Sequence, residues 1–179
     1  MRSLHLEREV RQDGLKSAEG HLHKTQIDLA PDLRGKMVEL CNARLADCTD
    51  LTAQVKTAHW NVKGSDFIGL HKLFDEIYEE VSENTDTIAE RCVQLGGTAM
   101  GTVRIAARQS QLEEYPTDIF ACEDHVRELS RRLAAFGKLI RESAEQSDEA
   151  GDMCTSDVFV EIGRSIDKWL WFVEAHQQV

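Results

Sequence analysis

The stretch KTAHWNVKGSDFIGLHKLFD, residues 56–75, decides the fold, because a break in it separates two helical patterns. The apolar residues before the break recur every three or four positions, and Asn-Val-Lys-Gly, residues 61–64, interrupts them. Ser65 or Asp66 can cap a new helix directly after the interruption. Two helices joined by so short a connection pack side by side and antiparallel. We therefore expect a helical hairpin that turns at this break.

The two helices of this hairpin are predicted to cover about residues 32–62 and about residues 66–95. Gly96 and Gly97 can end the second helix, since glycine commonly follows the last helical residue. A single apolar stripe defines the first helix: Leu33, Met37, Leu40, Cys41, Leu45, Cys48, Leu51, Val55 and Ala58.

The second half of the chain repeats the pattern after a long connection, residues 96–116, which holds one short helical candidate at residues 103–109. Two more periodic segments follow, at about residues 117–146 and 156–175. The apolar stripe of the first is Ile119, Phe120, Cys122, Val126, Leu129, Leu133, Phe136 and Ile140, and that of the second is Phe159, Ile162, Ile166, Leu170 and Val173. The predicted fold class is all-α, a four-helix bundle with a short extra helix in the long crossover connection. We expect residues 29–179 to form this domain and residues 1–28, which lack comparable periodicity, to be a flexible N-terminal tail.

The composition narrows the class of protein. With 32 acidic and 21 basic side chains the net charge is -11, which opposes non-specific nucleic-acid binding by the body and favours cations. No apolar run approaches the roughly 18 to 20 residues that span a bilayer, and the N-terminus has no secretory pattern. We expect a cytoplasmic protein with no membrane partner. The scattered cysteines are expected to be reduced and mostly buried: Cys41, Cys48, Cys92, Cys122 and Cys154.

A stripe of possible metal ligands runs along the second helix. Starting from His71 at 100° per residue, Asp75, Asp86 and Glu90 fall at about 40°, 60° and 100°. The stripe points away from the core, because the apolar residues of this helix cluster between about 200° and 300°. They are Leu73, Phe74, Ile77, Val81, Ile88, Cys92 and Leu95. His59, at the end of the first helix, is a fifth candidate ligand.

The length of the stripe excludes one metal site built by one chain. The midpoint of His71 and Asp75 lies about 22 Å along the helix from that of Asp86 and Glu90. If two copies of the helix pack antiparallel across a two-fold axis, the first pair of one subunit comes opposite the second pair of the other. The small side chains of Ser82 and Ala89 lie on the same stripe and would let the backbones approach; they are at about 20° and 0°. We therefore expect two identical sites between subunits.

The ligand types point to iron. Imidazole and carboxylate groups without thiolate suit iron(II), and few ligands per metal leave positions open for an oxidant. A di-iron site inside one bundle is disfavoured, since no histidine has a glutamate three residues before it. The alternative is that exposed acids at four-residue spacing are ordinary solvated charges. His59 and His71 argue against that alternative.

Residues 56–75 resemble the first signature of the Dps family of miniferritins. The resemblance continues through residues 86–97, and residues 167–174 are similar to the family's last helix, so that about residues 30–176 are covered. It implies a ferritin-like four-helix bundle that assembles as a hollow homo-oligomer of twelve subunits. It also implies a ferroxidase centre shared by two subunits: His59, His71 and Asp75 from one, and Asp86 and Glu90 from its two-fold mate.

The resemblance implies iron as the metal and iron storage as the function. Members of this family oxidise iron(II) with hydrogen peroxide in preference to oxygen, store the iron(III) mineral inside and protect the cell and its DNA from oxidative stress. Trp60 is similar to the tryptophan beside the family's centre, although packing in the core is an equal alternative.

The resemblance also implies acidic pores on three-fold axes that admit iron, lined in part by the start of the last helix. Asp152 and Asp157 match this feature, and Asp148 and Glu149 rank below them. Met153 and Cys154 stand where the acidic run often continues. An alternative is that Asp157 only complements the helix dipole.

DNA binding is expected to be weak, because the tail is almost neutral. Residues 1–24 hold five cations, Arg2, Arg8, Arg11, Lys16 and Lys24, against Glu7, Glu9, Asp13 and Glu19. His5, His21 and His23 could add charge below about pH 6.5, whereas we expect His125 and His176 to be structural. Two alternatives stay open: a DNA-compacting, nucleoid-associated protein with incidental iron chemistry, and a non-enzymatic helical oligomer, which would bind no iron.

Overall fold

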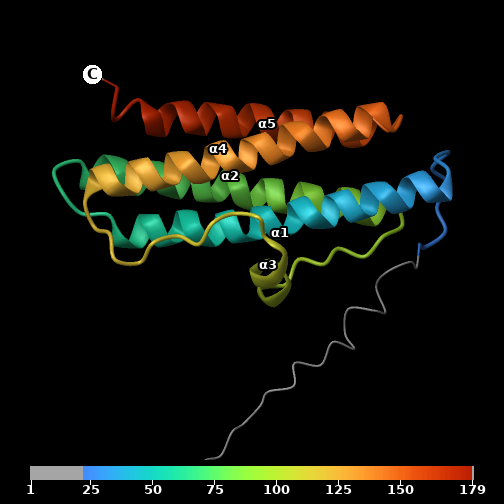
Figure 1. The fold of residues 1–179 in the computed structure, drawn as a ribbon, viewed down its shortest axis with the longest axis horizontal. Helices are drawn as coiled ribbons and strands as arrows, with labels where there is room; N and C mark the ends of the chain where they lie inside the picture. Colours follow the sequence, from blue (N-terminus) through green and yellow to red (C-terminus); the bar gives the residue numbers. More distant parts are fainter. Residues whose placement is uncertain (1–21, 179) are drawn as a thin grey trace, which may run out of the picture.

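The computed structural model describes residues 22–178, and the secondary structure that it contains there is five helices. They are α1 (Pro31–Asn61), α2 (Phe67–Gln94), α3 (Val103–Gln109), α4 (Cys122–Glu149) and α5 (Met153–Glu174). The four long helices form a bundle in which α1 packs against α2 and α4, and α5 packs against α4 and α2 (Figure 1). The all-α bundle predicted from the sequence is confirmed.

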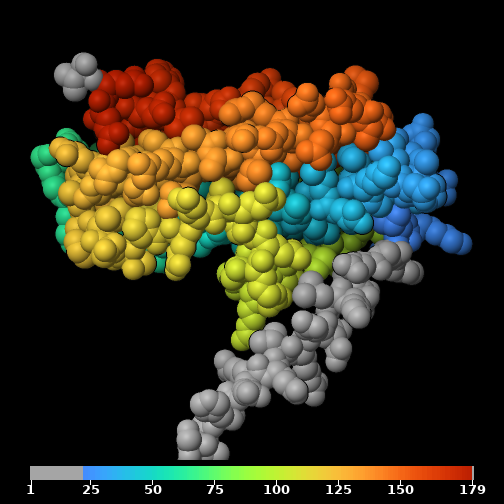
Figure 2. All heavy atoms as spheres, in the orientation of Figure 1, coloured from blue at the N-terminus to red at the C-terminus, as the bar shows by residue number. Residues whose placement is uncertain are grey.

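The long crossover exists because α2 and α4 run in the same direction (Figure 1). The chain leaves the end of α2, passes through α3 and returns along the bundle before α4 begins. The short helix at residues 103–109 was predicted with the bounds that the structure has. Figure 2 shows α3 standing out from the surface of the bundle.

The core lies between the four long helices and takes apolar side chains from each of them. Phe74 of α2, Phe136 of α4 and Phe159 of α5 are the largest of its fully buried side chains. The α1 residues that face it include Cys41, Leu45 and Leu51. These positions belong to the stripes read from the sequence, so the apolar spacing identified the buried faces. No helix among residues 22–178 is both long and apolar enough to span a membrane.

The helix α4 begins at Cys122, so its predicted start near residue 117 is wrong. The Lys63 amide donates to the Phe120 carbonyl at 2.8 Å, and the Cys122 amide donates to the Lys63 carbonyl at 3.1 Å. The chain before α4 is therefore extended against the turn between α1 and α2. Phe120, expected on the buried stripe, is 50% exposed. Backbone pairing with a distant turn overrides the local apolar pattern here.

The helix α5 begins three residues before the predicted Ser156, because Asp152 caps it. The Thr155 amide donates to Asp152 Oδ1 at 3.1 Å, which satisfies one of the free amides of the first turn.

Residues 22–28, the described part of the predicted tail, attach to the end of α2. The His23 amide donates to the Gly96 carbonyl at 2.8 Å, and Arg34 donates to the Leu95 carbonyl at 2.8 Å. Gly96 has a φ of 90°, and a Cβ there would lie 2.5 Å from the His23 carbonyl oxygen. Only glycine fits this contact. The remaining tail residues, with His5 and His21, lie outside the described residues.

The five cysteines are free thiols, four buried and Cys154 exposed, in agreement with the sequence-based expectation. Burial raises the pKa of Cys41 and of Cys48 to about 12. Both thiols therefore stay protonated near neutral pH and act as small apolar side chains.

Candidate metal centre

His59 and His71 meet across the corner between α1 and α2. Their rings stack with centroids 3.7 Å apart. His59 Nδ1 lies 2.7 Å from the His71 carbonyl oxygen, and His71 Nδ1 lies 2.9 Å from the His59 carbonyl oxygen. A carbonyl oxygen can only accept, so each Nδ1 carries a proton and donates it. In the neutral rings both Nε2 atoms are left unprotonated, which is the form that binds a metal.

The turn between the helices brings the rings of His59 and His71 side by side. Gly64 occupies it with a φ of 135°, and the Phe67 amide donates to the Gly64 carbonyl at 3.2 Å. His59 lies in the last turn of α1 and His71 in the second turn of α2. Phe67 packs beside His71 with ring centroids 5.1 Å apart. The tight turn therefore creates the histidine pair.

Asp75 lies one helical turn after His71 and joins the histidine pair. Its Oδ1 atom is 3.8 Å from His59 Nδ1 and forms an ion pair with Lys56 Nζ. The hydrogen bond from Lys56 lowers the pKa of the Asp75 carboxyl, and the nearby histidines lower it further. Asp75 is therefore a carboxylate at neutral pH.

Lys56 is the residue of this site that the sequence analysis missed. Its ammonium group also lies 4.4 Å from the centroid of the Tyr78 ring, within the range of a cation–π contact. The available clue was that Lys56 precedes His59 by three residues and so shares its face of α1. Only the packing of α1 on α2 reveals its contact with Asp75.

Asp86 and Glu90 are exposed on α2, away from the core as predicted. One subunit does not bring the five predicted ligands together. Within the described part of the chain there is no group of three or more His, Cys, Asp or Glu side chains arranged to hold a metal ion. His59, His71 and Asp75 lie close together, and Asp86 and Glu90 stand apart from them along α2.

A groove of about 1030 Å³ runs over α1 and α2 toward α3. Its lining includes Lys56, Trp60, Asp86, Ser82 and Ala89, so it contains one residue of the ligand stripe, Asp86, and the neighbour of His59 in the sequence, Trp60. Trp60 is 67% exposed, which excludes core packing as its role within one subunit. An exposed tryptophan in an apolar groove with a floor of small residues is typical of a surface that another protein covers.

The acidic residues predicted for a pore differ in exposure. Asp152 is only 2% exposed, and both of its carboxylate oxygens lie 3.0 Å from an Arg91 guanidinium nitrogen. Burial alone would raise the pKa of Asp152, but hydrogen bonds from Thr155 and the charge of Arg91 outweigh it and lower the pKa. This enclosure argues against Asp152 as a pore-lining acid. Asp148 and Asp157 are exposed and stay candidates.

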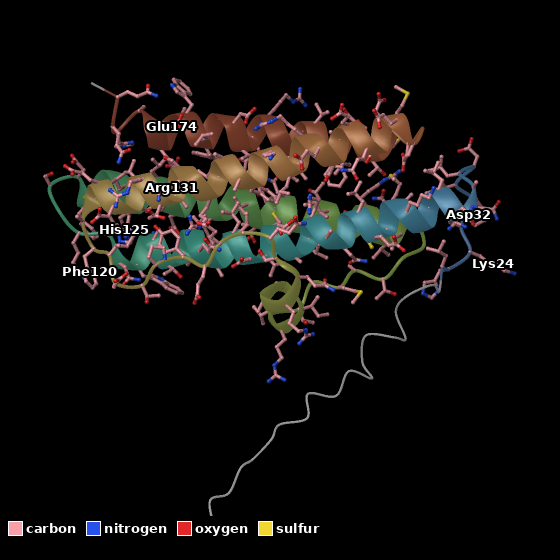
Figure 3. The ribbon with its side chains drawn as sticks, viewed as in Figure 1. Lys24, Asp32, Phe120, His125, Arg131 and Glu174 are labelled. Carbon is pink, nitrogen blue, oxygen red and sulfur yellow. The ribbon has the colours of Figure 1, made fainter. Side chains whose placement is uncertain are left out.

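His125 and His176 lie apart from the ligand stripe. His125 is 1% exposed, and its Nδ1 lies 2.9 Å from the Tyr115 hydroxyl. His176 is exposed, and its Nδ1 bonds to the Phe172 carbonyl at 2.9 Å. Figure 3 places His125 and Phe120 at one end of the bundle and Asp32 and Lys24 at the other. The structural role expected for His125 agrees with its burial and hydrogen bond.

Comparison with known proteins assigns this architecture to a family. Residues 38–179 match the family of ferritin-like domains. The chain is 43% identical over 156 residues to the DNA protection during starvation protein of Agrobacterium fabrum, covering 87% of this chain and 96% of the relative. It is 31% identical over 141 residues to the protein of that name from Helicobacter pylori, covering 79% and 98%.

Solved structures agree with these relatives. DpsC from Streptomyces coelicolor superposes with a TM-score of 0.84 at 28% identity, covering 89% of this chain and 94% of that one. Dps from Mycobacterium smegmatis superposes with a TM-score of 0.82 at 27% identity, covering 86% and 94%. The fold, the matched family and the relatives together show that this chain belongs to the Dps family of ferritin-like proteins.

Proposed function

We propose that this chain is the subunit of a hollow homo-oligomer of twelve that oxidises iron(II) at centres shared between two-fold-related subunits and stores the iron(III) product. The histidine pair carries the proposal. Two imidazoles with oriented Nε2 atoms lie beside an ionised carboxylate, and one subunit supplies too few ligands to complete the site.

A second subunit would complete the centre. The missing ligands are Asp86 and Glu90 of the partner subunit, since the same α2 carries both halves of the stripe about 22 Å apart. The groove over α1 and α2 supports this pairing, because it is lined by Trp60 and by the small residues Ser82 and Ala89. Antiparallel pairing of two α2 helices generates two identical centres.

Iron(II) is the substrate, and hydrogen peroxide is the proposed oxidant. Two iron(II) ions lose one electron each, and the two electrons reduce one peroxide molecule to the oxidation level of water. With two further waters the products are two FeOOH units and four protons, so that atoms and charge balance. His59, His71 and Asp75 bind and orient the substrate, and the mixed nitrogen and oxygen ligands suit iron(II). Oxygen is the alternative oxidant.

Protection of DNA follows from this chemistry. The curated relatives are named DNA protection during starvation proteins. Removal of iron(II) and peroxide together prevents the oxidative damage that the pair would cause. The net charge of -11 favours this indirect protection over coating of DNA by the body of the protein.

Anaerobic titration with iron(II), followed by addition of peroxide and sizing by light scattering, tests the proposal. We expect a particle of about twelve subunits and absorbance from iron(III) that depends on peroxide. His71→Ala should lose the fast oxidation, whereas His176→Ala, at an exposed histidine outside the stripe, should keep it. Equal oxidation by both variants, or a particle no larger than a dimer, would overturn the proposal.

A further inference from the structure

We propose that Lys56 is a built-in counter-ion of the centre, which occupies the Asp75 carboxylate when the site is empty and must leave it when a divalent cation binds. The inference rests on the proposed function, because it concerns the same half-site. It assigns Lys56 as a positioning residue. Lys56 weakens the binding of a divalent cation at Asp75 relative to binding at His59 and His71.

The contact geometry places Lys56 in competition with a metal ion. Lys56 Nζ pairs with Asp75 Oδ1, and this oxygen is the carboxylate atom 3.8 Å from His59 Nδ1. A cation held by the Nε2 atoms of His59 and His71 would take Asp75 as its carboxylate ligand, and Lys56 already pairs with that carboxylate. The ammonium group and the metal ion would therefore compete for one carboxylate.

Lys56 is fixed in this position from two sides. Asp75 pairs with its ammonium group, and the Tyr78 ring, one turn further along α2, lies 4.4 Å from the same nitrogen. The Lys56 side chain is 23% exposed, well below a freely solvated lysine. Lys72 offers the contrast, since it lies beside His71 on the same helix, is exposed, and makes no ion pair with any residue that the structure describes.

The charges around an empty centre explain why a counter-ion is needed there. Asp75 lies close to the groove that Asp86 lines, and two-fold pairing would add the carboxylates of the partner subunit. Like charges without a cation repel one another, and Lys56 neutralises part of this charge. A divalent ion brings two positive charges and makes the ammonium group redundant. Once the ion is bound, the ammonium group is repelled and must move.

Cobalt(II), which is not oxidised under anaerobic conditions, tests the inference without iron oxidation. The visible absorbance of cobalt(II) bound to the assembled oligomer reports its ligand field. Calorimetric titration of the same oligomer gives the stoichiometry and the affinity of cobalt binding. Lys56→Met keeps the length of the side chain and removes its charge, and Lys72→Met makes the same charge change without the contact. A centre that takes two cobalt ions binds them in two steps, and the second step is the weaker one. We expect the Kd of this second step to be about tenfold lower in Lys56→Met than in the wild type, since one positive charge close to a divalent ion has been removed. Lys72→Met should match the wild type.

Further variants keep the test decisive. Lys56→Arg retains the cation and should bind cobalt as weakly as the wild type at the second step. Lys56→Gln replaces Lys56→Met if the latter does not assemble by light scattering. Unchanged stoichiometry and affinity in the uncharged variants, or tightening in Lys56→Arg as well, would overturn the role of Lys56. If His71→Ala binds cobalt like the wild type, the centre itself is absent and the proposed function fails with the inference.

Discussion

His59 and His71 hold each other in place, because Nδ1 of each ring donates to the backbone carbonyl of the other residue, at 2.7 and 2.9 Å. The metal-binding form of both rings thus depends on the spacing between the last turn of α1 and the second turn of α2. A hydrogen bond to one ring nitrogen fixes the tautomer and leaves the other nitrogen free. The helical hairpin therefore contributes its own backbone carbonyls to the proposed centre.

Asp75→Asn should slow peroxide-driven iron(II) oxidation by at least about tenfold while the oligomer stays assembled, since it removes an anionic ligand outside the bundle core. Stopped-flow absorbance with light scattering on the same sample measures both quantities. Asp118→Asn, at an exposed aspartate in the loop before α4, is the matched control and should behave as the wild type. Unchanged kinetics in Asp75→Asn would remove Asp75 from the ligand set.

Trp60→Phe should leave the initial iron(II) oxidation largely unchanged, because an indole ring does not ligate iron and Phe retains an aromatic group in the groove. Stopped-flow traces at equal iron(II) loading provide the comparison. A loss of oxidation as large as that of a ligand variant, with the oligomer intact, would mean that Trp60 takes part in the chemistry.

His125 should make the protein less stable in mild acid. Burial lowers the pKa of His125 from its ordinary 6.5, because the imidazolium form loses hydration. Between the folded pKa and 6.5 the unfolded chain binds more protons than the folded one, so stability rises with pH. The contribution is fully present above 6.5 and is lost as the pH falls through the folded pKa.

Melting temperatures from pH 5 to pH 8 test this effect. We expect the acid-side fall in Tm to be shallower in His125→Phe than in the wild type, whereas His176→Phe, at an exposed histidine, should follow the wild-type curve. Each pKa unit between the folded and unfolded forms corresponds to about 1.4 kcal/mol. Identical slopes in His125→Phe and the wild type would show that His125 does not contribute to acid sensitivity.

Asp152→Ala should destabilise the protein by about 3 kcal/mol, since it leaves the buried Arg91 guanidinium without its carboxylate and removes the cap of α5. Asp157→Ala, four residues after the first residue of α5 and exposed, should change stability by no more than about 0.5 kcal/mol. Chemical denaturation of both variants gives the comparison. Equal stabilities would contradict the structural role assigned to Asp152.

The sequence predicted the four long helices and the side of α2 that faces away from the core, where the candidate ligands lie, because apolar spacing reports which face is buried. It missed the start of α4, where pairing with Lys63 decides the backbone conformation. It also missed Lys56, since a lysine on α1 becomes part of the site only after α1 packs on α2. The cap by Asp152 was assigned to a pore for the same reason: the contact with Arg91 joins residues 61 positions apart. Local sequence patterns predict the helices, whereas the contacts between helices become visible only in the structure.

The division of ligands between two subunits is tested most directly by mixing two inactive variants. His71→Ala damages one half of every centre, and Glu90→Ala damages the other half. In a mixed two-fold pair one centre collects both defects and the other collects none. With random pairing half of the pairs are mixed, so roughly one quarter of all centres regain a full ligand set.

The measurement is the fast phase of iron(II) oxidation by the two variants co-refolded in equal amounts, against the same variants refolded separately and then combined. Shared centres predict that co-refolding restores about one quarter of the wild-type amplitude, while the separately refolded mixture stays inactive. Centres built from one chain could not be repaired by mixing, so no recovery in co-refolded, fully assembled particles would contradict the intersubunit site.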